Sequence, residues 1–130
     1  MVAGFCTQNW AQRHETTAEL VEDLLAQMEK GQLDFTNTFA DLDAETAQHI
    51  PDWNAKWHAA KPDENTWRQA NPRVIPRTHK IEEAIKAATD GDFEPFHTML
   101  SAVSAPFAVA PEFMVPPEEN QKVRQTFCGT

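Results

Sequence analysis

Glycine is scarce in this chain of 130 residues, and its scarcity excludes one class of site. The four glycines stand singly, at positions 4, 31, 91 and 129. A loop that binds nucleotide phosphates needs several glycines close together, so that backbone amides can approach the phosphate oxygens. We therefore expect no phosphate-binding loop and no cofactor held by this chain itself.

Cysteine is also scarce. The two cysteines, Cys6 and Cys128, lie near opposite ends of the chain and do not form a C-x-x-C pair. The first residues lack the succession of basic, apolar and small residues that is typical of a secretory leader. We therefore expect a cytoplasmic protein.

Basic residues are too few for a nucleic-acid partner. Lys and Arg total 11 against 20 Asp and Glu, so the net charge is −9. Residues 1–66 carry 4 basic and 12 acidic groups, whereas residues 67–130 carry 7 and 8. Binding to a phosphate backbone needs a basic surface, which the composition does not supply.

A long uninterrupted apolar run is missing as well. The longest apolar stretch, residues 102–115, contains Pro106, Pro111 and Glu112, so it cannot cross a bilayer as a helix. We expect no membrane partner.

The sequence has no cluster of side chains typical of a metal site or a catalytic site. No two of the histidines are three or four residues apart, the spacing that places two metal ligands on one helix face. They stand at positions 14, 49, 58, 79 and 97. No serine or cysteine lies in a strand-turn-helix context that would suit a nucleophile. We expect no metal site and no catalytic residue in this chain.

Helical periodicity is what the sequence does have. A capping box at Thr16 precedes apolar residues at helical spacing up to Gly31. Further apolar stripes follow Asp34, Pro51, Pro62, Pro76 and Asp92, and they include Phe35, Phe39 and Leu42; Trp53 and Trp57; and Phe93, Phe96, Leu100 and Val103. No run alternates with period two long enough for a strand.

These patterns predict an all-α fold, a small bundle of five or six short helices with an extended Pro-rich C-terminal tail. We expect residues 1–15 to form an N-terminal arm or linker and residues 16–104 the helical domain. Residues 105–130 would form the tail, held by Phe107, Phe113 and Phe127 and ending in a cysteine.

A basic cluster at the start of the Pro76 helix is the first candidate for function. Arg77, His79 and Lys80 would lie in the first helical turn, where cations are disfavoured by the helix dipole. Acidic groups should compensate them, either inside the chain, through Glu82, Glu83 and the acidic first half, or on an external acidic partner. The surplus of carboxylates favours the internal pairing, and the three residues stay candidates for an interdomain contact.

Several motifs together resemble a known family. They are Asn71-Pro72, Ile75-Pro76-Arg77, residues 80–85 (KIEEAI), Asp90-Gly91-Asp92-Phe93 and the terminal residues 126–130 (TFCGT). In this order the sequence resembles the C-terminal part of the SelO family, the selenoprotein O or YdiU-like proteins. Thr78 departs from the asparagine that the family pattern has after the arginine.

The resemblance implies a parent protein with a kinase-like fold that binds ATP and Mg²⁺ and transfers AMP to protein hydroxyls. The family's nucleotide-binding, metal-binding and catalytic residues belong to its longer kinase-like portion, so none can be assigned here. The implied partner of this chain is that kinase-like portion, and the chain alone would be inactive.

One functional residue is implied by the resemblance. Family members carry cysteine or selenocysteine close to the C-terminus, and Cys128 stands at that position. In the family this residue can form a regulatory disulfide with a cysteine of the kinase-like portion. Cys6 matches no family position.

The first hypothesis is that the chain is an accessory, regulatory domain, and two other hypotheses stay open. The chain could be a stand-alone helical interaction module without enzymatic activity, which an independent reading frame would favour. It could also be a thiol protein acting through Cys128 alone, which would require a lowered thiol pKa. Arg124 is the nearby cation that the sequence guarantees for this purpose.

Overall fold

The computed structural model of the chain describes the backbone of residues 7–122 and 124, and the side chains from residue 17 onward within that range. By internal contacts the chain divides into two compact units, Met1–Glu64 and Asn65–Thr130. The sequence patterns do not indicate this boundary, although the change in charge balance falls close to it. Each unit is described by itself below.

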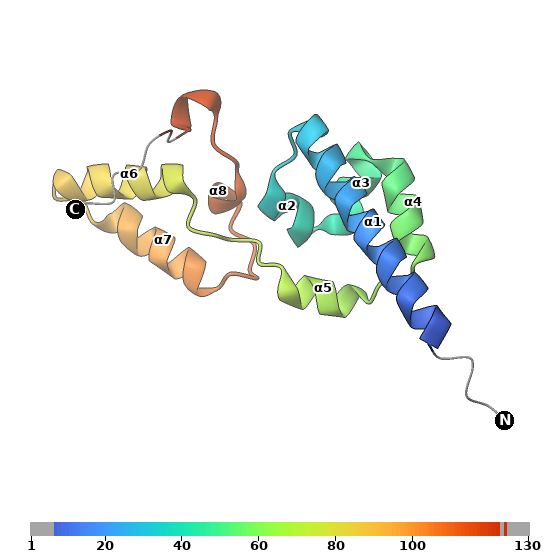
Figure 1. Ribbon diagram of the computed structural model, residues 1–130. Helices are drawn as coiled ribbons and strands as arrows, with labels where there is room; N and C mark the ends of the chain where they lie inside the picture. The colour runs from blue at the N-terminus through green and yellow to red at the C-terminus, as the bar shows by residue number, and fades with distance from the viewer. Residues whose placement is uncertain (1–6, 123, 125–130) are drawn as a thin grey trace, which may run out of the picture. The chain divides into compact units, whose positions relative to one another are not determined.

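The described residues of the first unit form four helices (Figure 1). They are α1 (Thr7–Gly31), α2 (Phe35–Ala40), α3 (Leu42–His49) and α4 (Pro51–Ala59). Helix α4 packs against both α1 and α3, and α2 packs against α3. The long helix α1 thus supplies one wall of the unit and the three short helices supply the other.

The second unit is also helical. Helix α5 (Glu64–Ala70) starts at the boundary, and α6 (Thr78–Thr89), α7 (Glu94–Ser104), α8 (Pro111–Met114) and the 3-10 helix η1 (Glu119–Gln121) follow. Helices α6 and α7 pack along each other after a turn at Gly91, whose φ of +88° favours glycine. No strand forms in residues 7–122, which confirms the predicted all-α class.

Helix boundaries differ from the sequence prediction at several points, including α6, which begins at Thr78 and not at Pro76. Helix α1 begins at Thr7 rather than beside Thr16, because residues 7–15 contain no proline or glycine that would stop a helix. The predicted helix after Asp34 is interrupted at Asp41, whose φ of −135° and ψ of 57° end α2 and begin α3. The capping role of Asp34 is confirmed, since its Oδ1 accepts a hydrogen bond from the Asn37 amide at 2.9 Å.

The core of the first unit joins α1 to α4. Leu24 and Met28 of α1 are buried together with Trp53 and Trp57 of α4. The Trp53 indole donates a hydrogen bond from Nε1 to the Leu20 carbonyl at 2.7 Å. The tryptophans predicted as an i, i+4 pair therefore serve as the apolar contact and as a polar tie between the two helices.

A polar network joins α3 to α4. Thr46 is completely buried, and its hydroxyl donates to the Leu42 carbonyl at 2.6 Å. The amide nitrogen of Asn54 lies 3.0 Å from the Thr46 hydroxyl and 3.0 Å from the Asp43 carboxylate. His58 Nε2 also lies 2.7 Å from this carboxylate. Because the buried threonine has partners, its burial does not leave an unsatisfied hydroxyl.

The interior of the second unit is small and partly polar. Among its described residues, the buried apolar side chains are Val74, Ala84 and Phe113, and Arg77 and His79 are buried beside them. The segment before α6 is fixed by its backbone, since the amides of residues 73 and 74 donate to the carbonyl of residue 106 at 2.8 and 3.0 Å.

The C-terminal segment is more structured than an extended tail. It contains α8 and η1, so the prediction for residues 105–130 is wrong for these two stretches. Proline at the first position of α8 explains the local helix, because its fixed φ suits a helix start. Phe113 is buried as expected, but Phe107 is 53% exposed. Phe127 lies outside the described residues.

Replacing Leu24 with alanine should destabilise the first unit by about 2–5 kcal/mol, because Leu24 is 2% exposed and its loss leaves a cavity. Leu25→Ala is the matched control on the next position of α1. Leu25 is 43% exposed, so its replacement should cost less than about 1 kcal/mol. Urea unfolding followed by tryptophan fluorescence measures both, and equal effects would contradict the described packing.

Candidate functional site

The terminal cysteine predicted to act in redox control cannot be placed. Cys128 lies outside the described residues, as does Cys6. Its regulatory role stays a prediction, and the other candidates, Arg77, His79 and Lys80, all lie at the start of α6.

Arg77 is the N-cap residue of α6, but its side chain points into the second unit. The residue is 7% exposed. Its Nε donates to the Phe113 carbonyl at 3.2 Å and its Nη2 donates to the Met114 carbonyl at 3.1 Å. One guanidinium therefore joins the start of α6 to the end of α8.

The end of α8 explains why an arginine suits this position. The last carbonyls of a helix have no partner within the helix, and the helix dipole makes them favourable neighbours for a cation. Helix α8 has four residues, so its own backbone bonds stabilise it little. The rigid fork of the guanidinium can bond two carbonyls at once, which a lysine ammonium does less well.

His79 is buried in the same interior. It is 5% exposed, and its Nδ1 has no hydrogen-bond partner among the described residues. Burial lowers the pKa of His79 below its ordinary value of 6.5, and the charge of Lys80 lowers it further; Glu83 acts in the opposite direction and Arg77 in the same one. The folded unit therefore favours the neutral imidazole.

Lys80 has an acidic partner on its own helix. Its Nζ lies 2.8 Å from the Glu83 carboxylate, and the two side chains are 25% and 48% exposed. The predicted internal compensation of the basic turn is confirmed for this residue. An interdomain contact through Arg77, His79 and Lys80 stays a prediction, and the structure gives the first of them a role within the second unit.

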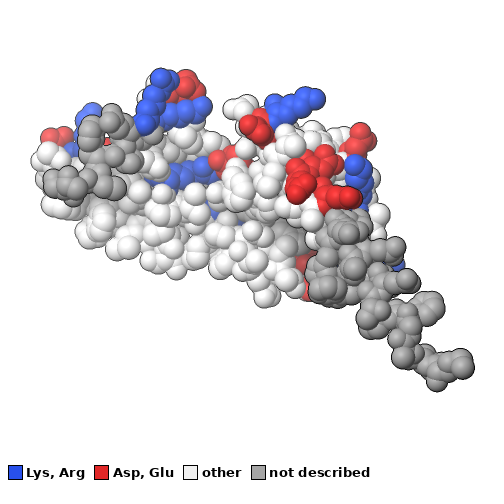
Figure 2. All heavy atoms as spheres, viewed as in Figure 1, with Lys and Arg blue, Asp and Glu red and all other residues white. Residues whose placement is uncertain are grey.

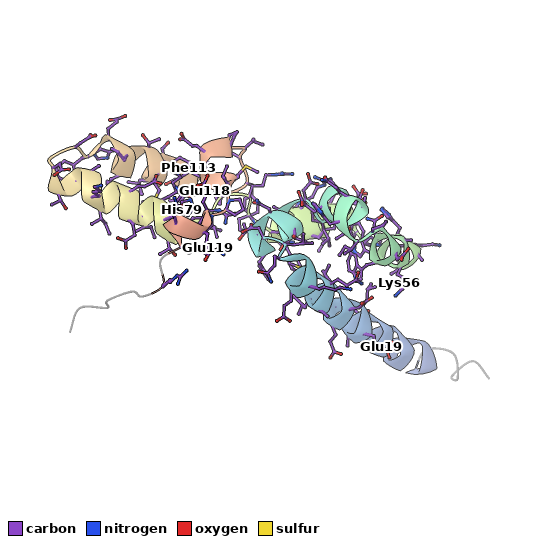
Figure 3. All side chains as sticks on the ribbon, turned by 90° about the horizontal axis from the view of Figure 1, so that it is seen from above. Glu19, Lys56, His79, Phe113, Glu118 and Glu119 are labelled. Carbon is purple, nitrogen blue, oxygen red and sulfur yellow. The ribbon has the colours of Figure 1, made fainter. Side chains whose placement is uncertain are left out.

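A groove of about 510 Å³ opens beside the start of α6. It is lined on one side by residues 75–79 and on the other by Pro117, Gln121, Lys122 and Arg124. Glu119 and His79 are both labelled in Figure 3. The Glu119 carboxylate lies 2.6 Å from Nζ of Lys122 and 3.2 Å from Nη2 of Arg124. The hydrogen bond and charge of Lys122 lower the pKa of Glu119, and Arg124 adds to this.

A second groove, of about 230 Å³, lies between α6, α7 and α8. Its charged lining consists of Lys80, Glu83, Glu94 and Glu112.

In the described part of the chain, no three His, Cys, Asp or Glu side chains are grouped closely enough to hold a metal ion. None of the helices in that part is long and apolar enough to span a membrane.

The apolar stripe of α7 is the feature whose placement the sequence does not reveal. Its spacing predicts a face that turns inward, yet Phe93, Phe96 and Leu100 are 57%, 43% and 48% exposed. Periodicity identifies a face of a helix and does not say what covers it. In the described part of this unit the face therefore stays exposed.

Curated relatives match most of the chain. It is 39% identical over 140 residues to the protein nucleotidyltransferase YdiU of Rhodopseudomonas palustris (strain BisB5). It is 37% identical over 126 residues to that of Mycolicibacterium smegmatis and 35% identical over 136 residues to that of Bacillus cereus (strain AH187). These alignments cover 87%, 90% and 89% of this chain.

The relatives are much longer than the chain. The same three alignments cover 28%, 26% and 28% of their lengths, so the chain spans about a quarter of each. No family model matches the chain. No solved structure matches it either.

Replacing Arg77 with methionine should lower the free energy of unfolding of the second unit by about 2–4 kcal/mol, because two carbonyls lose a buried charged donor. Lys86→Met is the matched control, since Lys86 is an exposed cation on the same helix and its loss should cost less than about 1 kcal/mol. Urea unfolding followed by circular dichroism gives both values. An Arg77→Met variant as stable as Lys86→Met would refute the role in joining α6 to α8.

The lowered pKa of His79 predicts a pH dependence of stability. Below pH 6.5 the unfolded chain binds a proton at His79 more readily than the folded unit does. The stability contributed by the neutral His79 is therefore fully present above pH 6.5 and falls as the pH drops toward the folded pKa. The slope of unfolding free energy between pH 7 and about pH 5 should shrink in His79→Gln. His97→Gln, which replaces an exposed histidine of α7, is the control for the substitution itself.

Proposed function

We propose that this chain is a helical accessory domain of a YdiU-family nucleotidyltransferase, because it matches about a quarter of the length of such proteins. The parent protein would transfer AMP from ATP to protein hydroxyls, with ATP and Mg²⁺ bound by its kinase-like portion. The observation that carries the proposal is the coverage: 87% of this chain matches 28% of the Rhodopseudomonas relative.

The roles of the buried polar side chains support an accessory part. Arg77 bonds two carbonyls of its own unit, and Thr46 and Asn54 bond each other in the first unit. These groups stabilise the fold of their own units. The chemistry of the transfer is then assigned to the remaining three-quarters of the parent protein.

The proposed role of the domain is to pack against the kinase-like portion and to present Cys128 for a regulatory disulfide. The sequence resemblance supports this assignment of Cys128.

A separate helical module that binds another protein is the alternative, and the exposed stripe of α7 is compatible with it. The two proposals differ in what precedes the chain in its gene. A kinase-like reading frame continuous with residue 1 supports the accessory domain, and an independent start with its own promoter supports the module.

The proposal predicts that the isolated chain does not transfer nucleotide. The chain would be incubated with ATP labelled at the α-phosphate, Mg²⁺ and an acceptor protein, and label on protein would be counted. The complete Rhodopseudomonas relative is the positive control. Label transferred by the chain alone would contradict the proposal.

A graft tests the accessory role itself. In the Rhodopseudomonas relative, the region that matches this chain would be deleted in one variant and replaced by this chain in another. We expect the deletion to lower the yield of folded, active protein and the graft to restore part of it. A graft that is no more active or stable than the deletion would contradict the proposed role.

A further inference from the structure

The surface of α7 is apolar over one continuous face. Phe93, Phe96 and Leu100 follow each other at spacings of three and four residues, which places them on one side of the helix. They are 57%, 43% and 48% exposed. Figure 2 shows that the surface over α7, at the lower left, carries neither Lys or Arg nor Asp or Glu in this view.

Helix α7 is the most apolar of the longer helices and yet is poorly buried. All eleven of its residues are described, and none of them is buried. Its other side packs on α6, where Ala84 is buried but Ile85 is 55% exposed. The stripe is therefore left over after α6 and α7 have packed together.

The whole second unit shows the same imbalance. Its described residues bury three apolar side chains and expose seven large ones, namely Ile85, Phe93, Phe96, Leu100, Phe107, Val109 and Val115. Single exposed apolar side chains are normal, but several on one face mark an interaction surface. A unit of this size also has little core to spare, so apolar area left in water is a considerable loss of stability.

Three occupants could cover this face: a second copy of the chain, an unrelated protein, or the rest of a YdiU-family protein. The relatives favour the third, because about three-quarters of each lies outside the match and must meet this domain through some surface. The lack of charge on the face agrees with an apolar contact, since charged residues are depleted in the core of interfaces.

We propose that the stripe formed by Phe93, Phe96 and Leu100 seats an apolar surface of the remaining part of the YdiU-family protein. The inference rests on the proposed function and adds the residues through which the domain is held. In the complete protein the three side chains leave water, and α7 changes from a surface helix to a buried one. The basic start of α6 lies outside this contact.

Hydrogen exchange tests the contact in the grafted protein described above. The amides of residues 94–104 should exchange at least roughly tenfold more slowly in the graft than in the isolated chain, because burial of the stripe stabilises α7 against local opening. Unchanged exchange in α7, with protection elsewhere in the chain, would overturn the proposal. Activity of the graft would then still support the proposed function, so the two failures are distinguishable.

A negative charge introduced into the stripe gives the second test. Phe96→Glu and Leu100→Glu place a carboxylate in the stripe, and either should abolish the added protection in the graft. Ser101→Glu is the matched control, because Ser101 is an exposed residue of α7 turned about a quarter of a turn from Leu100. Circular dichroism of each isolated chain checks that the fold is kept, and equal protection in all three grafts would overturn the proposal.

Sedimentation equilibrium of the isolated chain covers the alternative occupant. A monomer at all concentrations agrees with the proposal. A dimer that Phe96→Glu dissociates and Ser101→Glu leaves intact would assign the face to a second copy of the chain and would overturn the inference.

Discussion

Among its described residues the second unit buries three apolar side chains and leaves seven large ones exposed, and this imbalance explains most of what is unusual in it. Val74, Ala84 and Phe113 fill its interior with two polar side chains, whereas the stripe of α7 faces solvent. A domain of about 60 residues buries a smaller fraction of its surface than a larger one does. Apolar side chains that remain outside are then available for contact with another part of a longer protein.

Because the apolar interior of the second unit is small, polar side chains contribute much of what holds its segments together. The Arg77 guanidinium bonds two carbonyls at the end of α8, and this places the C-terminal segment against the start of α6. His79 lies in the same interior with a lowered pKa, so it contributes as a neutral ring. A basic turn that suggests an external partner in the sequence thus has two of its three side chains turned inward.

The sequence predicted the helical class and most helices, because capping residues, prolines and apolar spacing act locally. Asp34, Pro51 and Gly91 all mark boundaries that the structure has. It did not predict the break at Asp41, and it missed the start of α1 at Thr7 because residues 7–15 lack apolar periodicity, although they also lack a proline or glycine that would stop a helix. The outward stripe of α7 was missed for a different reason: spacing is the same whether a face meets its own core or another domain. The Nδ1 of His79, which has no hydrogen-bond partner among the described residues, could not be identified from the sequence.

The greater length of the relatives bears on how the exposed face of α7 is interpreted. An apolar stripe on a separate small protein would be a liability for aggregation, whereas on one quarter of a larger protein it is an unfinished interface. The most direct measurement is a structure of a complete YdiU-family protein that contains this chain. The account predicts that Phe96 and Leu100 are buried there against residues from outside the 130 described by this sequence. Side chains that stay as exposed as 43% and 48% in the complete protein would contradict it.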